Sequence, residues 1–181
     1  MRIPETDPDA LTPEQKEIYD RITAGPRGQV RGPYHAYLLH PGVCEGIERM
    51  GHFLRFAATL PGNIRELAII TVGRHWKAEF EWFAHAPIAI REGVSEDIVE
   101  AIKAGETPEF ADPDEAAVHG FVRALLETGR TDDETYADMK ARFGEDGIVE
   151  LTGIVGHYTG VAMTLNTFEI VPPEGERPDF T

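Results

Sequence analysis

Residues 65–85 read RELAIITVGRHWKAEFEWFAH, and the pattern of this stretch decides the fold class. Its first half is apolar over about three helical turns, and its β-branched centre would also suit a buried strand. No neighbouring segment alternates apolar and polar residues as strands do, so we predict a helix over 64–76. Lys77 marks a bend, and a second helix follows over about 79–92, with Gly93 after its end.

The rest of the chain shows helix start and stop signals on both sides of this pair. Thr12 followed by Pro13 predicts a helix start, and Ser95 predicts another. Asn63 is the expected cap of the 64–76 helix. Further helices are predicted over about 42–59, from Asp112 or Asp114 to 128, from Thr131 or Asp132 to 143, and over 148–170. The sum is seven or eight helices and no convincing strand, which predicts an all-α fold.

Between these elements lie a long loop and two terminal segments. The loop over 25–42 carries Gly, Pro and Arg, and long loops in compact domains often line functional sites. An N-terminal arm over 1–12 and an extended Pro-rich tail over 170–181 flank the helices, and the tail is expected to pack on a neighbouring subunit. We expect a single domain over residues 1–181, since this length suits one.

Composition excludes several classes of function. The chain has 32 acidic and 17 basic residues, and its formal net charge is −15. Such a surface repels nucleic acid and anionic membranes, so an anionic substrate would need local Arg or His side chains. The single cysteine, Cys44, allows neither an internal disulfide nor a cysteine zinc cluster. We expect a cytoplasmic protein: the first residues lack the apolar core of a signal peptide, and the apolar runs look too short to span a bilayer.

Glu81 and His85 form the first candidate site. Four residues apart on a helix, they share one face and lie within hydrogen-bonding reach. A carboxylate that accepts from one imidazole nitrogen fixes the tautomer and leaves the other nitrogen for proton transfer. Trp82 flanks the pair with apolar surface. The alternative is an ordinary solvated helix face, where Glu and His pairs at this spacing are common.

Glu66 is the only carboxylate between Ile64 and Trp76, in an otherwise apolar helix. It is either a surface residue favoured by the helix dipole or a buried functional group. His157 and Tyr158 interrupt the apolar 148–170 segment, so they are either satisfied core residues or a second wall of a pocket.

Tyr34 and His35 lie in the long loop and are further candidates for substrate binding. Arg74, Arg31 and His35 are the groups that could supply positive charge to an anionic substrate. His75, Glu79 and His85 allow a metal site on spacing alone, but the HExxH arrangement is missing, and we expect neither a metal nor a cofactor. Cys44 lies beside apolar residues and is expected to be structural.

The stretch 65–102, RELAIITVGRHWKAEFEWFAHAPIAIREGVSEDIVEAI, resembles the carboxymuconolactone decarboxylase-like family, which shares the AhpD-like all-helical fold. The matching features are Glu66, Trp82 within FEWFAH, His85 and the turn over 93–95. The segment GIVGHYTGVAMTLNTFEI over 153–170 resembles the last helix of that family. The resemblance covers about residues 40–170 and implies an AhpD-like helical bundle.

The alkylhydroperoxide reductase-like branch of the superfamily carries Glu, eleven residues, Cys-x-x-Cys, three residues and His. On this chain Glu66 and His85 match, whereas Ala78 and Glu81 stand at the two cysteine positions. A thiol peroxidase needs a thiolate nucleophile and usually a resolving thiol, so peroxidase chemistry is not expected here.

The resemblance therefore implies the decarboxylase-like branch, with Glu66, Glu81 and His85 as an acid–base set. The expected function is a lyase without a cofactor, acting on a small carboxylated or lactone-like metabolite. The alternatives are a peroxiredoxin-like antioxidant enzyme and a non-catalytic oligomer that binds small molecules. The resemblance also implies a homo-oligomer, a trimer or a hexamer, and no nucleic-acid or membrane partner.

Overall fold

The computed structural model describes residues 1–180, and within them every regular element is helical. The prediction of an all-α fold with seven or eight helices is confirmed, and the strand alternative for 64–76 is wrong. A short 3₁₀ helix, η1, precedes eight α-helices. Their bounds are η1 Pro8–Ala10, α1 Pro13–Ala24, α2 Tyr34–Tyr37, α3 Pro41–Phe56, α4 Gly62–His75, α5 Glu79–Arg91, α6 Glu96–Ala104, α7 Pro113–Thr128 and α8 Asp133–Thr167.

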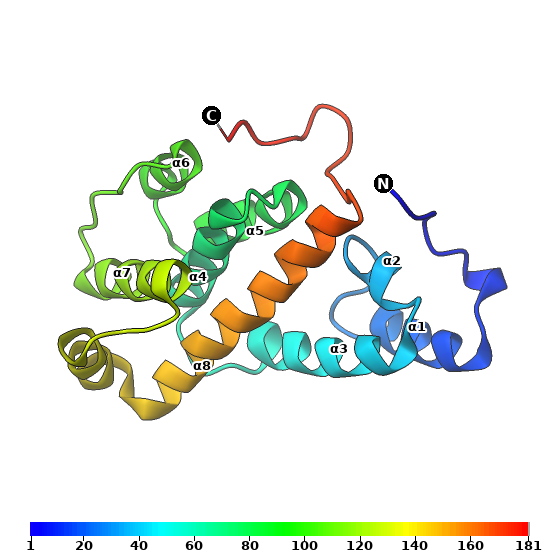
Figure 1. The fold of residues 1–181 in the computed structure, drawn as a ribbon, viewed down its shortest axis with the longest axis horizontal. Coiled ribbons are helices and arrows are strands. Elements are labelled where there is room, and N and C mark those ends of the chain that lie inside the picture. Colours follow the sequence, from blue (N-terminus) through cyan, green and yellow to red (C-terminus); the bar gives the residue numbers. More distant parts are fainter. Residues whose placement is uncertain (181) are drawn as a thin grey trace.

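Helix α4 lies at the centre of the molecule and packs against α5, α7 and α8 (Figure 1). Helix α8 crosses the molecule diagonally in that view, with α7 near its start and α3 on its other side. Helices α1 and α2 pack on α3, which places the N-terminal third of the chain at one end of the molecule. The remaining helix, α6, packs on α4 and α5.

Local sequence signals start several helices where they were predicted. The Thr12 side chain accepts from the Gln15 backbone, and Gln15 returns a bond to the Thr12 N–H, which completes a capping box. The side chains of Ser95, Asp112 and Asp132 likewise accept backbone N–H groups in the first turns of α6, α7 and α8. These caps satisfy donors that the helix itself leaves unpaired.

Two predicted helix boundaries, the start of α4 and the end of α3, are wrong because tertiary contacts override the local signals. Asn63 does not cap α4, because its side-chain amide donates to Glu115 on α7 at 3.0 Å and Pro61 stands at the cap position. Helix α3 ends at Phe56, three residues before the predicted end. The buried Glu150 carboxylate accepts the N–H groups of Thr59 and Leu60, which holds the following loop away from the helix.

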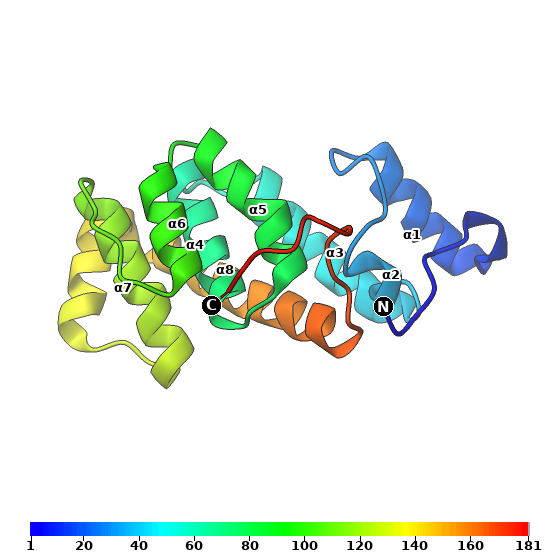
Figure 2. The same ribbon diagram turned by 90° about the horizontal axis from the view of Figure 1, so that it is seen from above.

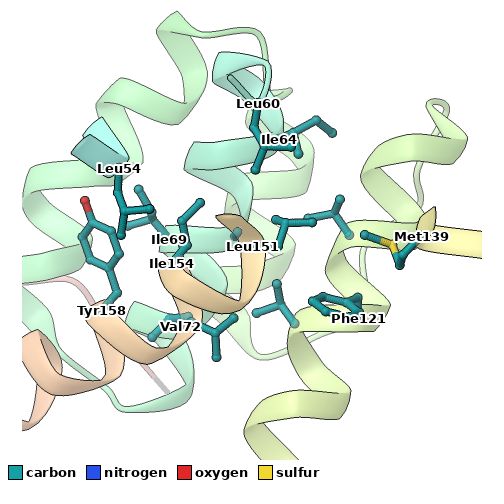
Figure 3. Packing of buried hydrophobic residues seen from close by; sticks show 14 residues of the cluster. Leu54, Leu60, Ile64, Ile69, Val72, Phe121, Met139, Leu151, Ile154 and Tyr158 are labelled. Atoms are coloured by element: carbon teal, nitrogen blue, oxygen red, sulfur yellow. The ribbon is translucent and has the colours of Figure 1, made fainter. Parts of the chain in front are cut away.

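The main core lies between α3, α4, α7 and α8 (Figure 3). Fully buried members include Ile69 from α4, Phe121 from α7 and Ile154 from α8. Tyr158 lies at one edge of this cluster, beside Leu54 of α3 in the figure. A second cluster joins α4, α5 and α6, so α4 and α5 are fixed together from two sides.

Helix α8 contains a break at Gly144, whose φ of 72° is left-handed and divides the element where two helices were predicted.

The expectation that no segment is long enough to span a bilayer needs correction, since α8 passes that test by length and composition, with a mean hydropathy of 1.2. Within the described residues, 44% of its apolar window is buried against the rest of the chain. Its contacts with α3, α4, α5 and α7 are those of the core helix of a folded domain.

The C-terminal tail contacts its own chain, running past α5 and α8 (Figure 2). The Phe180 ring meets the Trp82 ring edge-on at 5.6 Å between centroids, and Arg177 Nε donates to Glu79 at 2.7 Å. The tail thus packs on α5 of its own chain, and its packing on a neighbouring subunit stays a prediction. At the other end of the chain, Arg2 pairs with Glu169.

Candidate active site

A tight turn between α4 and α5 brings two distant parts of the sequence together. Lys77 takes a left-handed φ of 49°, so the chain bends where the sequence predicted. Helix α5 then packs along α4, and a carboxylate from the first turns of α4 faces an imidazole on α5.

His85 lies between two carboxylates in the interior. Its Nδ1 forms a hydrogen bond of 2.7 Å with Glu66 Oε2, and its Nε2 lies 3.2 Å from Glu81 Oε1. All three residues are at most 4% exposed. The structure therefore excludes the solvated helix face that was the alternative for Glu81 and His85. It also excludes the surface position, favoured by the helix dipole, that was the alternative for Glu66. Glu66, rather than Glu81, makes the shorter contact that orients the ring.

The two carboxylates respond differently to the same interior. For Glu66, burial favours the neutral acid, but the hydrogen bond with His85 and the charges of His85, Arg65 and Arg55 outweigh it, so the pKa is lowered. For Glu81, burial dominates, and despite the charges of His85 and Arg55 the pKa is raised. One imidazole thus has a carboxyl group with a lowered pKa on one side and a carboxyl group with a raised pKa on the other, a division found in acid–base sites.

His85 and Glu81 form part of the wall of a cavity of about 380 Å³, a size that suits a small metabolite. The cavity is enclosed by the loop before α2 and by helices α2, α3, α5 and α8. The long loop predicted to line a site does so through residues 26–33. Glu66 lies behind His85, outside the cavity wall.

The cavity is cationic although the protein is strongly acidic. Arg27, Arg31, Arg55 and Arg91 line it, and Glu81 is the only acidic residue in its wall. Within residues 1–180, Arg27, Arg31 and Arg55 form no ion pair, while most other arginines do. Arginines without carboxylate partners in a protein with 32 acidic residues indicate a site for an anion.

Aromatic groups complete the wall. The Arg27 guanidinium lies 4.9 Å from the Tyr34 ring centroid, a cation–π contact that holds the side chain in place. The Tyr158 ring meets the His85 ring edge-on at 5.3 Å. His157 also lines the cavity, and burial together with the charges of Arg27 and His85 lowers its pKa to about 4, so it is neutral at pH 7.

Three predicted substrate-binding residues lie elsewhere. Arg74 Nε donates to the Lys103 carbonyl at 2.7 Å, and its guanidinium stacks over Phe180. His35 Nδ1 accepts the Thr6 N–H and lies outside the cavity. Trp82 faces the second core cluster and the tail. The structure thus brings Arg31, Tyr34, His157 and Tyr158 to the cavity and separates Arg74, His35 and Trp82 from it.

Sequence reasoning missed Arg27, Arg55, Arg91 and Tyr37 as cavity residues. The only available signal was the position of Arg27 in the long Gly- and Pro-rich loop. Arg55 and Arg91 lie near the ends of helices, where a basic residue is explained by the helix dipole without any site.

Cys44 offers no redox chemistry at this cavity. It is fully buried on α3 and does not belong to the cavity wall. Burial, with the charge of Glu48, raises the pKa of its thiol to about 12, whereas a reactive cysteine needs a low pKa. In the part of the chain that the structure describes, no three His, Cys, Asp or Glu side chains form a metal cluster, and His75 and Glu79 do not join His85 in one.

No protein-family model and no curated protein matches the sequence. Solved structures with this fold include two peroxidase-related proteins. A protein from Ralstonia eutropha JMP134, described as an alkylhydroperoxidase AhpD core and an uncharacterized peroxidase-related protein, superposes with a TM-score of 0.78 at 12% identity, covering 97% of this chain and 93% of its own. An uncharacterized peroxidase-related protein from Silicibacter sp. TM1040 gives 0.76 at 13% identity, covering 100% and 95%. The chain has the AhpD-like fold that the sequence pattern indicated.

Proposed function

We propose that this AhpD-like chain is a lyase of the carboxymuconolactone decarboxylase type, which uses acid–base catalysis on a small carboxylated or lactone-like metabolite. The proposed proton-transfer group is His85. Glu66 orients its ring, and Glu81 shares the proton on its Nε2. The reaction needs no cofactor, because every step below uses side chains of the chain itself.

One observation carries the proposal: a buried imidazole between two carboxylates with oppositely shifted pKa values opens onto a cavity where Arg27, Arg31 and Arg55, within residues 1–180, form no ion pair. A purely structural ion pair would not need a cavity beside it. Nor would it need cations gathered around that cavity.

The geometry supports the following steps. The substrate carboxylate binds among the unpaired arginines, which replace part of its hydration. The bond between this carboxylate and the neighbouring carbon breaks, CO₂ leaves, and the electron pair passes into a conjugated carbonyl, forming a dienolate. His85 Nε2 then gives its proton to the carbanionic carbon, and Glu81 or solvent returns a proton to His85. The ionised Glu66 stabilises the imidazolium between these transfers.

The proposal does not extend to thiol peroxidase activity. Ala78 and Glu81 occupy the positions of the missing cysteine pair, and Cys44 is buried away from the cavity.

We also propose a homo-oligomer, trimeric or hexameric, in the cytoplasm. Exposed apolar side chains on α3, namely Val43, Met50 and Phe53, support self-association, and light scattering tests it.

The test is turnover of a panel of small unsaturated carboxylic acids and carboxylated lactones in D₂O, followed by proton NMR. We expect loss of CO₂ from at least one member and one solvent deuteron at the carbon that carried the carboxylate. His85→Gln should lower the rate by about 10²–10⁴-fold, the usual contribution of a positioned general acid.

His119→Gln is the matched control, because His119 is a buried histidine outside this cavity. Its rate should equal that of the wild-type protein. Equal turnover by His85→Gln and the wild type, or no turnover of any panel acid, would contradict the lyase assignment.

A further inference from the structure

Polar groups without partners are rare inside proteins, and in this chain they gather at one place. Within residues 1–180 the buried side-chain atoms without a hydrogen-bond partner are Arg27 Nε, Tyr37 Oη and Tyr158 Oη. All three residues line the cavity beside His85. A buried donor left unpaired costs about 1–3 kcal/mol, so three of them around one cavity indicate an acceptor that comes from outside the protein.

The two hydroxyls have different surroundings. Tyr158 is 3% exposed, lies edge-on to the His85 ring and lines the same cavity as the proton-transfer group. Tyr37 is 5% exposed on α2, beside the Thr164 hydroxyl, which donates to the Gly160 carbonyl and keeps its acceptor lone pairs. Neither ring can move far, because Tyr158 packs in the main core and Tyr37 in the cluster with α1.

The protonation state of Tyr158 makes it a donor. Burial, reinforced by the nearby charge of Glu81, raises its pKa well above the ordinary value of 10. It therefore stays a neutral phenol at any pH at which the protein works. A phenol of this kind, fixed in a site with little water, is suited to donate to an oxygen on which negative charge develops.

From these contacts we infer that Tyr158, assisted by Tyr37, donates a hydrogen bond to the carbonyl oxygen of the ligand that becomes the enolate. This inference rests on the proposed function. The ligand then carries two oxygen groups: a carboxylate held by Arg27 and its neighbours, and a carbonyl oxygen at the tyrosines. Acids without a second oxygen acceptor bind more weakly, because the tyrosine hydroxyls stay unpaired.

The test uses a stable enolate mimic and measures binding only. The ligand 4-hydroxy-3-nitrobenzoate carries a carboxylate and a phenol whose ionised form absorbs visible light, and 3-nitrobenzoate is the same molecule without the hydroxyl. We expect the wild-type protein to bind the phenolate form preferentially, so that the coloured form appears at a lower pH than in free solution. It should also bind this ligand more tightly than 3-nitrobenzoate.

Tyr158→Phe keeps the ring and removes the donor. We expect its affinity for the phenolate to fall roughly ten- to hundredfold, as for a lost hydrogen bond to a charged acceptor, with the affinity for 3-nitrobenzoate unchanged. Tyr136→Phe is the matched control, since Tyr136 lies on the same helix, α8, but outside the cavity. Its affinities should equal those of the wild type, and thermal melting of each variant reports on folding.

An unchanged phenolate affinity in Tyr158→Phe would overturn the inference, and so would an equal loss for both ligands or a wild-type protein that does not prefer the phenolate. The probe undergoes no reaction, so these outcomes leave the His85 proton transfer untouched. Conversely, failure of the lyase panel would leave the selectivity for the phenolate intact.

Discussion

The two sides of the His85 imidazole differ in what surrounds them. On the Nδ1 side, Glu66 is buried behind the ring at 2.7 Å, with Arg65 3.5 Å from its carboxylate. On the Nε2 side, Glu81 is equally buried but borders the cavity, together with arginines that have no partner. The first side satisfies its charges within the chain, and the second leaves charges and donors unpaired.

This difference separates structure from function within a single cluster. A paired and hydrogen-bonded carboxylate such as Glu66 contributes to the stability of the folded state. A carboxylate held against its solvation preference, such as Glu81, lowers that stability and is retained where chemistry needs it. The predictions below test this contrast, beginning with the largest expected effect.

Glu66→Ala should destabilise the protein by about 3–5 kcal/mol near neutral pH, because it removes one partner of a buried pair. The pKa of Glu66 is lowered in the folded state, so its contribution is present above the ordinary value of 4.5 and is lost as the pH falls through the folded value. Urea unfolding at several pH values measures this. If the loss of stability in Glu66→Ala does not shrink in acid, Glu66 does not act as an ionised partner.

Glu81→Gln should change stability in the opposite direction. The pKa of Glu81 is raised in the folded state, so the folded protein binds this proton more tightly than the unfolded chain does. Ionisation of Glu81 therefore destabilises the wild-type protein increasingly as the pH rises above 4.5. The variant should exceed the wild type in stability most at high pH and should not exceed it in acid. The same unfolding series detects this gain, which should be smaller than the loss in Glu66→Ala. Destabilisation that grows with pH would refute the contrast between the two sides.

Arg27→Gln should weaken the binding of benzoate about tenfold, as expected when one charge-assisted hydrogen bond is lost. Loss of the cation–π contacts of Arg27 with Tyr34 and Phe56 should lower the stability of the protein without ligand by about 1 kcal/mol. Calorimetry of benzoate binding checks the affinity, and thermal melting checks the stability. Arg130→Gln, at an exposed arginine away from the cavity, should leave both unchanged.

Phe180→Ala addresses the opposite face of α5, where Trp82 packs with the tail. The loss of one edge-on aromatic pair and of the cation–π contact with Arg74 should cost about 1 kcal/mol. Benzoate binding should be unaffected, because neither Trp82 nor Phe180 lines the cavity. A loss of benzoate affinity in this variant would mean that the tail is coupled to the site.

Local chemistry allowed most of the fold to be predicted. Caps act within one helical turn, so the sequence predicted Thr12 and Ser95 directly and narrowed the other two to Asp112 or Asp114 and to Thr131 or Asp132, of which the structure shows Asp112 and Asp132. The cap assigned to Asn63 failed because its amide is used by a contact with Glu115, 52 residues away. Such long-range contacts leave no periodic signal in the sequence.

The candidate site likewise has one part that local sequence predicts and one part that depends on long-range contacts. Glu81 and His85 are four residues apart on one helix, so their proximity follows from helix geometry. Glu66 and His85 meet only because α4 and α5 pack together, and this pairing was expected from the family resemblance and not from spacing. Arg27 and Arg55 were missed because their role depends on the absence of carboxylate partners, which only the folded structure reveals.

The central claim is that His85 exchanges a proton on its cavity side while Glu66 holds its other nitrogen. Nitrogen-15 NMR of the labelled histidines, with and without benzoate, tests it directly. The account predicts that the Nδ1 signal of His85 is that of a nitrogen carrying hydrogen with and without benzoate, whereas the Nε2 signal shifts when benzoate enters the cavity. An imidazole whose two nitrogen signals are both insensitive to benzoate would belong to a fixed structural ion pair and would contradict the account.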